Sequence, residues 1–134
     1  MANPAEGVIG LLSALQFHEL TTQTPHAVWM LLEPKDWAPV NPAVQIRVFR
    51  ASAASLRAGI QVHTIDSVPV PITAPAKTVA DCFKYRNKIG VDVAVEALRD
   101  LLARSRRASI DDLWRHAEVD RVQTVIRPYL EALA

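Results

Sequence analysis

Apolar residues near the start of the chain recur at the spacing of a helix. Within the segment GVIGLLSALQFHEL they are Val8, Leu11, Leu12 and Leu15. The last three lie three, four and seven residues after the first, which places all four on one stripe of a helix. The polar run TTQTP then interrupts the pattern. We therefore predict a core-facing helix over residues 7–19.

The middle of the chain shows the patterns of strands instead. Residues 26–34, HAVWMLLEP, are apolar at both alternating sets of positions, which predicts a strand covered on both faces. Residues 44–49, VQIRVF, alternate between an apolar set and a largely polar set, which predicts a half-buried strand. A proline-rich loop connects the two segments, and Trp37 within it is either a contact residue or a cover for the core.

A short helix or turn and a hairpin follow. The segment SAASLRAG, residues 52–59, predicts the short helical connection. The segments IQVHTID and VPVPIT predict a β-hairpin that turns at Asp66 and Ser67. Pro69 and Pro71 have no N–H to donate, so we expect the second strand to lie at a sheet edge or to bend away from the sheet.

From Pro75 onward the apolar spacing is that of helices. Pro75 suits a first helical position and Gly90 suits a helix end, and residues 91–104 carry an apolar stripe that begins at Val91. Ser109 with an aspartate three residues later resembles a capping box for a helix from residue 110.

A last helical segment covers residues 121–133 and contains Pro128, which predicts a kink. The order is thus one N-terminal helix, about four strands and about four C-terminal helical segments. This order predicts an α+β fold with a largely antiparallel sheet. We expect residues 1–134 to form a single domain.

The composition favours a soluble globular protein. Half of the 134 residues are hydrophobic, which is enough for a core of one domain. The 15 basic and 14 acidic residues nearly cancel, so no chain-wide field predicts binding to nucleic acid or to an anionic membrane. No apolar run approaches the roughly 18 residues of a membrane span, and the start lacks the basic region of a signal peptide. A cytoplasmic location is therefore expected, with no membrane partner.

Signals for metal binding or catalysis are few. The histidines have no ligand neighbour at the spacing of a zinc site: His18, His26, His63 and His116. The single Cys82 excludes an intrachain disulfide, and no histidine near it in sequence could activate it, so we predict a core residue. The sequence has no glycine-rich phosphate loop, no G-x-S-x-G and no H-E-x-x-H. We therefore expect no metal and no other cofactor.

One catalytic alternative remains open. Glu33, Pro34 and Lys35 at the end of a predicted strand, with Glu19 on the preceding helix, resemble the E-x-K arrangement of metal-dependent nucleases. In such enzymes carboxylates hold a divalent ion and the lysine steadies the attacking water.

Charged residues are concentrated in the segment APAKTVADCFKYRNKIG, residues 74–90. On a helical wheel Lys77, Asp81, Lys84 and Lys88 share one band, opposite an apolar band that includes Cys82. The band is either a solvated face with a Lys77–Asp81 ion pair or a positive strip that contacts an acidic protein surface or nucleic-acid phosphate. The contact candidates are Lys77, Lys84, Arg86, Lys88, Arg104, Arg106 and Arg107.

Three long segments resemble the C-terminal domain of AbiEi-type antitoxins, the antitoxin half of AbiE abortive-infection (type IV) toxin–antitoxin systems. They are GVIGLLSALQFHELTTQTPHAVWMLL, VPVPITAPAKTVADCFKYRNKIGVDVAVEALRDLL and IRPYLEAL. The resemblance covers nearly the whole chain.

The resemblance implies a bacterial, cytoplasmic and non-enzymatic protein that counteracts a nucleotidyltransferase-like toxin in phage defence. In that family an N-terminal winged-helix domain usually precedes this one and represses the operon. Residues 1–134 lack such a domain, so the resemblance implies DNA binding only where one is linked to this chain. It implies no catalytic residues.

Overall fold

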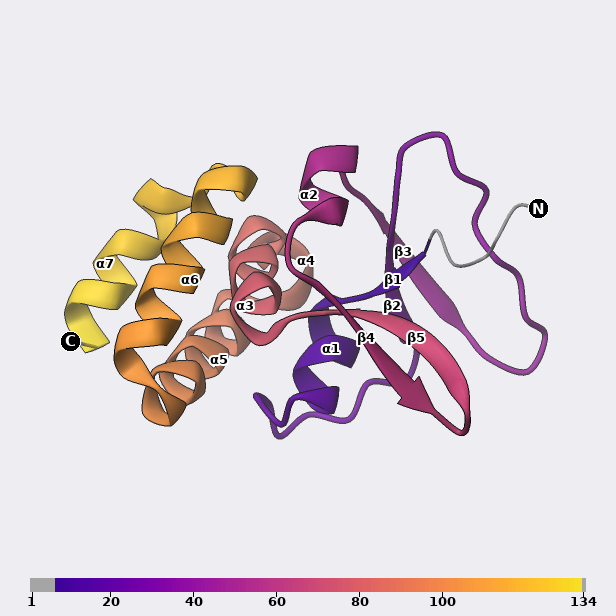
Figure 1. Ribbon diagram of the computed structural model, residues 1–134, viewed down its shortest axis with the longest axis horizontal. Coiled ribbons are helices and arrows are strands. Elements are labelled where there is room, and N and C mark those ends of the chain that lie inside the picture. Colours follow the sequence, from indigo (N-terminus) through magenta and orange to yellow (C-terminus); the bar gives the residue numbers. More distant parts are fainter. Residues whose placement is uncertain (1–6, 134) are drawn as a thin grey trace.

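The computed structural model describes residues 7–133 of the chain, except for the side chains of residues 106–108. Within these residues the chain forms a five-stranded sheet and helices, and Figure 1 shows α5, α6 and α7 gathered at one end of the molecule. The strands are β1 (Val8–Ile9), β2 (Val28–Leu32), β3 (Ile46–Arg50), β4 (Ile60–Ile65) and β5 (Val68–Thr73). The helices are α1 (Leu11–Phe17), α2 (Ala53–Arg57), α3 (Pro75–Lys84), α4 (Arg86–Ile89), α5 (Val91–Arg104), α6 (Arg106–Asp120) and α7 (Gln123–Leu133). The predicted α+β class is confirmed.

The sheet is mixed, with the strand order β3-β2-β1-β5-β4. The pairs β1–β2 and β4–β5 are antiparallel, whereas β1–β5 and β2–β3 are parallel. The prediction of about four largely antiparallel strands is therefore wrong in both number and direction. The additional strand is β1, which consists of Val8 and Ile9 and joins the β2–β3 pair to the β4–β5 hairpin.

The N-terminal segment is a strand followed by a helix, and the prediction of one helix over residues 7–19 is wrong at its start. Val8 pairs with Leu31 of β2, and the extended backbone of Gly10 separates β1 from α1. Val8 and the α1 leucines of the predicted stripe are nevertheless buried. An apolar stripe reports burial, and over a few residues it does not distinguish a strand from a helix.

The β4–β5 hairpin forms where the sequence predicts it. Asp66 and Ser67 both have positive φ, 50° and 67°, as the two central residues of a type I′ turn require. Among the described residues β5 pairs with β1 at Ile72 alone, so Pro69 and Pro71 lie in the part of β5 that pairs with β4. On this side of the sheet the edge strand is β4. The first half of β5 has a neighbouring strand only on the β4 side, so the predicted edge position of β5 is confirmed for that half alone.

The helical half differs from the prediction at three points, and the kink predicted at Pro128 of α7 stays a prediction. The helix predicted to start at Pro75 breaks at Tyr85 into α3 and α4 before it ends at Gly90. The capping box is wrong because α6 begins at Arg106, and Ser109 lies inside it with its hydroxyl donating to the Leu101 carbonyl at 3.3 Å. Val91, predicted to face the core, is 41% exposed.

The core is centred on α3, which packs against α1, α5 and α6. All residues from Ala76 to Phe83 of α3 are buried, so this helix has no solvent-facing side over two turns. Figure 1 shows α3 between the sheet side of the molecule and the outer helices. No helix in the described part of the chain has both the length and the apolar character of a membrane span.

Candidate functional site

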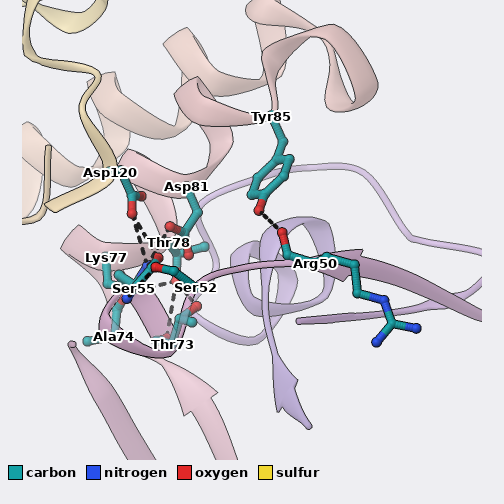
Figure 2. Close-up of polar contacts among 10 residues, drawn as sticks. All are labelled: Arg50, Ser52, Ser55, Thr73, Ala74, Lys77, Thr78, Asp81, Tyr85 and Asp120. Carbon is teal, nitrogen blue, oxygen red and sulfur yellow. Dashed lines mark hydrogen bonds and ion pairs between the residues drawn. The ribbon is translucent and has the colours of Figure 1, made fainter. Parts of the chain in front are cut away.

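A buried cluster of polar side chains lies where α2, α3 and α6 meet (Figure 2). Lys77 donates through Nζ to Asp81 Oδ1 at 2.6 Å and to Ser55 Oγ at 2.9 Å. Asp120 Oδ1 accepts from the Ser55 hydroxyl at 2.9 Å and lies 3.5 Å from Lys77 Nζ. Exposure of these four residues does not exceed 5%, so the cluster is closed to solvent.

Three helices and one strand end position the cluster. Lys77 and Asp81 stand one turn apart on α3, Ser55 comes from the short helix α2, and Asp120 is the last residue of α6. The Thr78 hydroxyl donates to the backbone carbonyls of Thr73, at 3.1 Å, and of Ala74, at 2.7 Å. These bonds fix the start of α3 to the end of β5.

The two carboxyl groups differ in their affinity for protons. Burial, together with the neighbouring Asp120, raises the pKa of Asp81 well above its usual value, and the charge of Lys77 opposes this only in part. Burial alone would raise the pKa of Asp120 as well, but its interactions with Asp81, Lys77 and Ser55 outweigh burial and lower it. Of the two carboxyl groups, Asp120 is therefore the one that more readily carries the negative charge that balances Lys77.

The structure corrects the sequence interpretation of Lys77. It was expected on a solvated helix face or a contact strip, but Lys77 and Asp81 are each 1% exposed. The wheel placed both residues on one side of the helix correctly. It could not reveal that α2 and α6 cover that side with Ser55 and Asp120. Lys77 therefore holds helices together and is not available to a partner.

The other candidates at the end of α3 remain at the surface. Lys84 is half-buried, with Nζ 5.5 Å from the centre of the Tyr85 ring. Arg86 donates to the Phe83 carbonyl at 2.9 Å, so it caps the end of α3. Lys88 on α4 is exposed. These three cations can reach a partner.

Arg104 lies at the opposite end of α3. It lines a surface depression with Ala74 and Pro75, at the start of α3, and a helix of ten residues is about 15 Å long. Its guanidinium donates to the backbone carbonyls of His18 and of Glu19, the latter at 2.8 Å. The predicted cations therefore do not form one continuous strip. The side chains of Arg106 and Arg107 lie outside the described residues.

His18, beside Arg104, is a partly buried histidine with a defined partner. Its Nε2 donates to the Thr73 carbonyl at 2.7 Å. Burial is the main cause that lowers the pKa of His18 below 6.5, and the nearby charges of His63 and Arg104 lower it further, while the bond to Thr73 opposes the shift.

This lowered pKa predicts a loss of stability in mild acid. The unfolded chain binds a proton at His18 at higher pH than the folded chain, so the free energy of unfolding falls as pH drops below 6.5. Urea unfolding between about pH 8 and pH 5.5 should show a steeper loss for the wild type than for His18→Gln. The exposed His26→Gln is the matched control and should keep the wild-type pH dependence. Equal slopes for all three proteins would contradict the prediction.

The residues of the nuclease alternative lie after the ends of β2 and α1 and are exposed or partly exposed. Glu33 and Lys35 follow β2, and neither side chain makes a hydrogen bond or ion pair to any described residue. Glu19 is exposed after the end of α1. In the part of the chain that is described, no three His, Cys, Asp or Glu side chains are grouped so that they could hold a metal ion.

The loop between β2 and β3 exposes large apolar side chains. Trp37 is 93% exposed and Val40 is 91% exposed, so the expectation that Trp37 covers the core is wrong. Figure 1 shows this loop on the side of the molecule away from α5, α6 and α7. An exposed tryptophan, in a loop that exposes a second large apolar side chain, is typical of a contact with another protein.

The base of this loop is fixed to the end of α3. Tyr85 donates through its hydroxyl to the Arg50 carbonyl at 2.6 Å, as Figure 2 shows. Arg50 in turn donates to the carbonyls of Glu33, at 2.9 Å, and Asp36, at 2.5 Å. Burial raises the pKa of Tyr85 to about 12, so its hydroxyl remains a donor at neutral pH. The loop therefore starts where the Tyr85 hydroxyl meets Arg50, and Lys84 and Arg86 are the sequence neighbours of Tyr85.

Comparison with known proteins gives no assignment: no protein-family model matches the chain, and no curated protein matches it. The functional proposal below is therefore based on the residues and their geometry, together with the resemblance described above. Sequence reasoning named Trp37 and the cations around Tyr85 as contact candidates, which stays a prediction. It missed Ser55 and Asp120, because no local pattern signals that residues from α2 and α6 meet a lysine on α3.

Proposed function

We propose that the chain is a non-catalytic interaction domain of the AbiEi antitoxin type that counteracts a nucleotidyltransferase-like toxin in bacterial phage defence. The observation that carries the proposal is the division between buried and exposed groups. The reactive side chains Lys77, Asp81 and Asp120 are at most 5% exposed, whereas Trp37 is 93% exposed. A domain built this way offers a contact surface rather than a reaction site. A cytoplasmic location, where such a toxin acts, is part of the proposal.

The contact surface combines an apolar anchor with cations. Trp37 supplies the anchor, since tryptophan is among the residues whose loss weakens protein interfaces most. Lys84, Arg86 and Lys88, in the segment around Tyr85, would favour an acidic partner surface, mainly by speeding association. Direct binding of DNA by this chain is not proposed, because Lys77 is buried and Arg104 lies apart from the other cations.

Co-expression with the toxin encoded beside the chain's gene tests the proposal. Trp37→Ala should weaken the complex by about 2 kcal/mol, roughly thirty-fold in dissociation constant, and reduce rescue of growth. Charge reversal of Lys84, Arg86 and Lys88 together should slow association. Val119→Ala, which changes an exposed apolar residue on α6, is the matched control and should leave rescue unchanged.

Two outcomes would contradict the proposed function. One is full rescue by the Trp37 variant and by the triple charge reversal, with circular dichroism showing an intact fold for both. The other is the absence of any nucleotidyltransferase gene next to the gene for this chain.

A further inference from the structure

The two edges of the sheet differ in chemistry. The strand β3 at one edge carries Arg47 and Arg50, whereas β4 at the other edge, IQVHTI, has no lysine, arginine, acid or proline. Soluble proteins usually protect long sheet edges with charges, prolines or bulges, because an open edge pairs with other strands. The edge at β4 is six residues long and lacks these residue types. Figure 1 shows its hairpin extending away from α5, α6 and α7.

Apolar side chains accompany this open edge. Val62 in β4 is 66% exposed, and Ile65 and Val68 at the turn are 40% and 56% exposed. Among the strands that the structure describes, β4 pairs with β5 alone. Half of its backbone N–H and C=O groups therefore point away from the sheet.

The hairpin register shows which residues point these groups outward. The two-residue turn is closed by the pair Ile65 and Val68, and in such a hairpin the closing pair is hydrogen-bonded. Bonded and non-bonded positions then alternate along the strand. It follows that Ile60, Val62 and Thr64 direct their backbone N–H and C=O groups to the free edge.

We propose that β4 pairs in antiparallel fashion with β4 of a second copy of this chain, about a two-fold axis at Val62. Opposite residues of an antiparallel pair lie on the same face of the sheet, so a two-fold axis between identical strands must pass through a pair of identical residues. Val62 is the central residue of the three that bond outward. This register places Ile60 opposite Thr64 of the second copy and uses the outward groups of all three residues.

The chemistry of the edge favours an identical partner. Two copies of a strand without lysine, arginine, aspartate or glutamate bring no such side chains opposite each other, and the strand offers none of them by which an oppositely charged partner would be selected. At the axis the two Val62 side chains cover each other. Gln61 of each copy faces His63 of the other, and these two side chains already form a hydrogen bond within the chain, Nε2 to Oε1 at 2.9 Å.

Light scattering coupled to size exclusion tests the assembly. The wild type should have about twice the chain mass of 14.8 kDa. Val62→Lys places two ammonium groups at the axis and should raise the dimer dissociation constant at least tenfold, roughly 1.4 kcal/mol. Val119→Lys, at an exposed apolar position on α6, should remain a dimer. A wild type that is monomeric up to about millimolar concentration overturns the proposal.

Oxidative cross-linking tests the register and does not depend on the behaviour of the lysine variant. Val62→Cys should form an intermolecular disulfide, because the two Cα atoms of such a pair lie about 5.5 Å apart. Thr64→Cys should not, because the axis separates the two positions by four residues, roughly 14 Å. The native Cys82 is fully buried and does not interfere. Equal cross-linking of both variants, or of neither, overturns the register.

Discussion

Replacing Lys77 with methionine is expected to lower the free energy of unfolding by about 3–5 kcal/mol, the usual cost of removing one partner from a buried ion pair. Methionine fills a similar volume but leaves Asp81 and Asp120 without the cation that Nζ provides at 2.6 and 3.5 Å. Part of the loss will be relieved because both carboxyl groups can take up protons. Urea unfolding at neutral pH measures the change.

The matched control for this substitution is Lys88→Met. Lys88 is exposed on α4, so its loss should change the free energy of unfolding by no more than about 0.5 kcal/mol. A loss below about 1 kcal/mol for Lys77→Met would show that the buried cluster contributes little to stability.

Gly59→Ala should be the second most damaging change. Gly59 has a φ of +70°, and an added Cβ would lie 2.6 Å from His116 Cε1 and 2.8 Å from Lys77 Cβ. The left-handed backbone costs a side chain about 1 kcal/mol or more, and overpacking adds about 1–3 kcal/mol. Lys77 has little freedom to move aside, because its Nζ is held by the buried cluster. Thermal unfolding followed by circular dichroism measures the loss.

Gly7→Ala separates overpacking from backbone strain. An alanine Cβ at Gly7 would meet the Met30 sulfur at 2.7 Å, but the methionine side chain is flexible and can move. Its φ lies outside the left-handed region. The loss of stability should therefore stay below about 1 kcal/mol. A loss equal to that of Gly59→Ala would show that neither the positive φ of Gly59 nor the fixed Lys77 side chain adds to the cost at Gly59.

Patterns within one segment predicted much of the fold. The hairpin at Asp66 and Ser67, the strand in residues 26–34 and the helix over 91–104 all form where local sequence placed them. The strand at Val8 could not be found in this way. Two residues are too few to show alternation, and the strand exists because distant residues of β2 and β5 bind both of its sides.

Of the candidate functional residues, the sequence could predict the exposed loop around Trp37 but not the buried cluster around Lys77. The proline-rich surroundings of Trp37 indicated a loop, and that residue is exposed. The buried state of Lys77 was not predictable, because a helical wheel gives the direction of a side chain but not what lies there. Its partners Ser55 and Asp120 are 22 and 43 residues away in sequence, beyond the reach of any periodicity.

The position of β1 sets the order in which this protein can be completed during synthesis. Ile9 leaves the ribosome well before Ile72, its neighbour in β5. Until then β1 can pair with β2 but not with β5, and the nascent chain holds the apolar segment around Ile9 without its final partner. Such long-range closure slows folding relative to a bundle of helices with local contacts. Protection by chaperones during translation would therefore matter most before the second strand of the hairpin emerges.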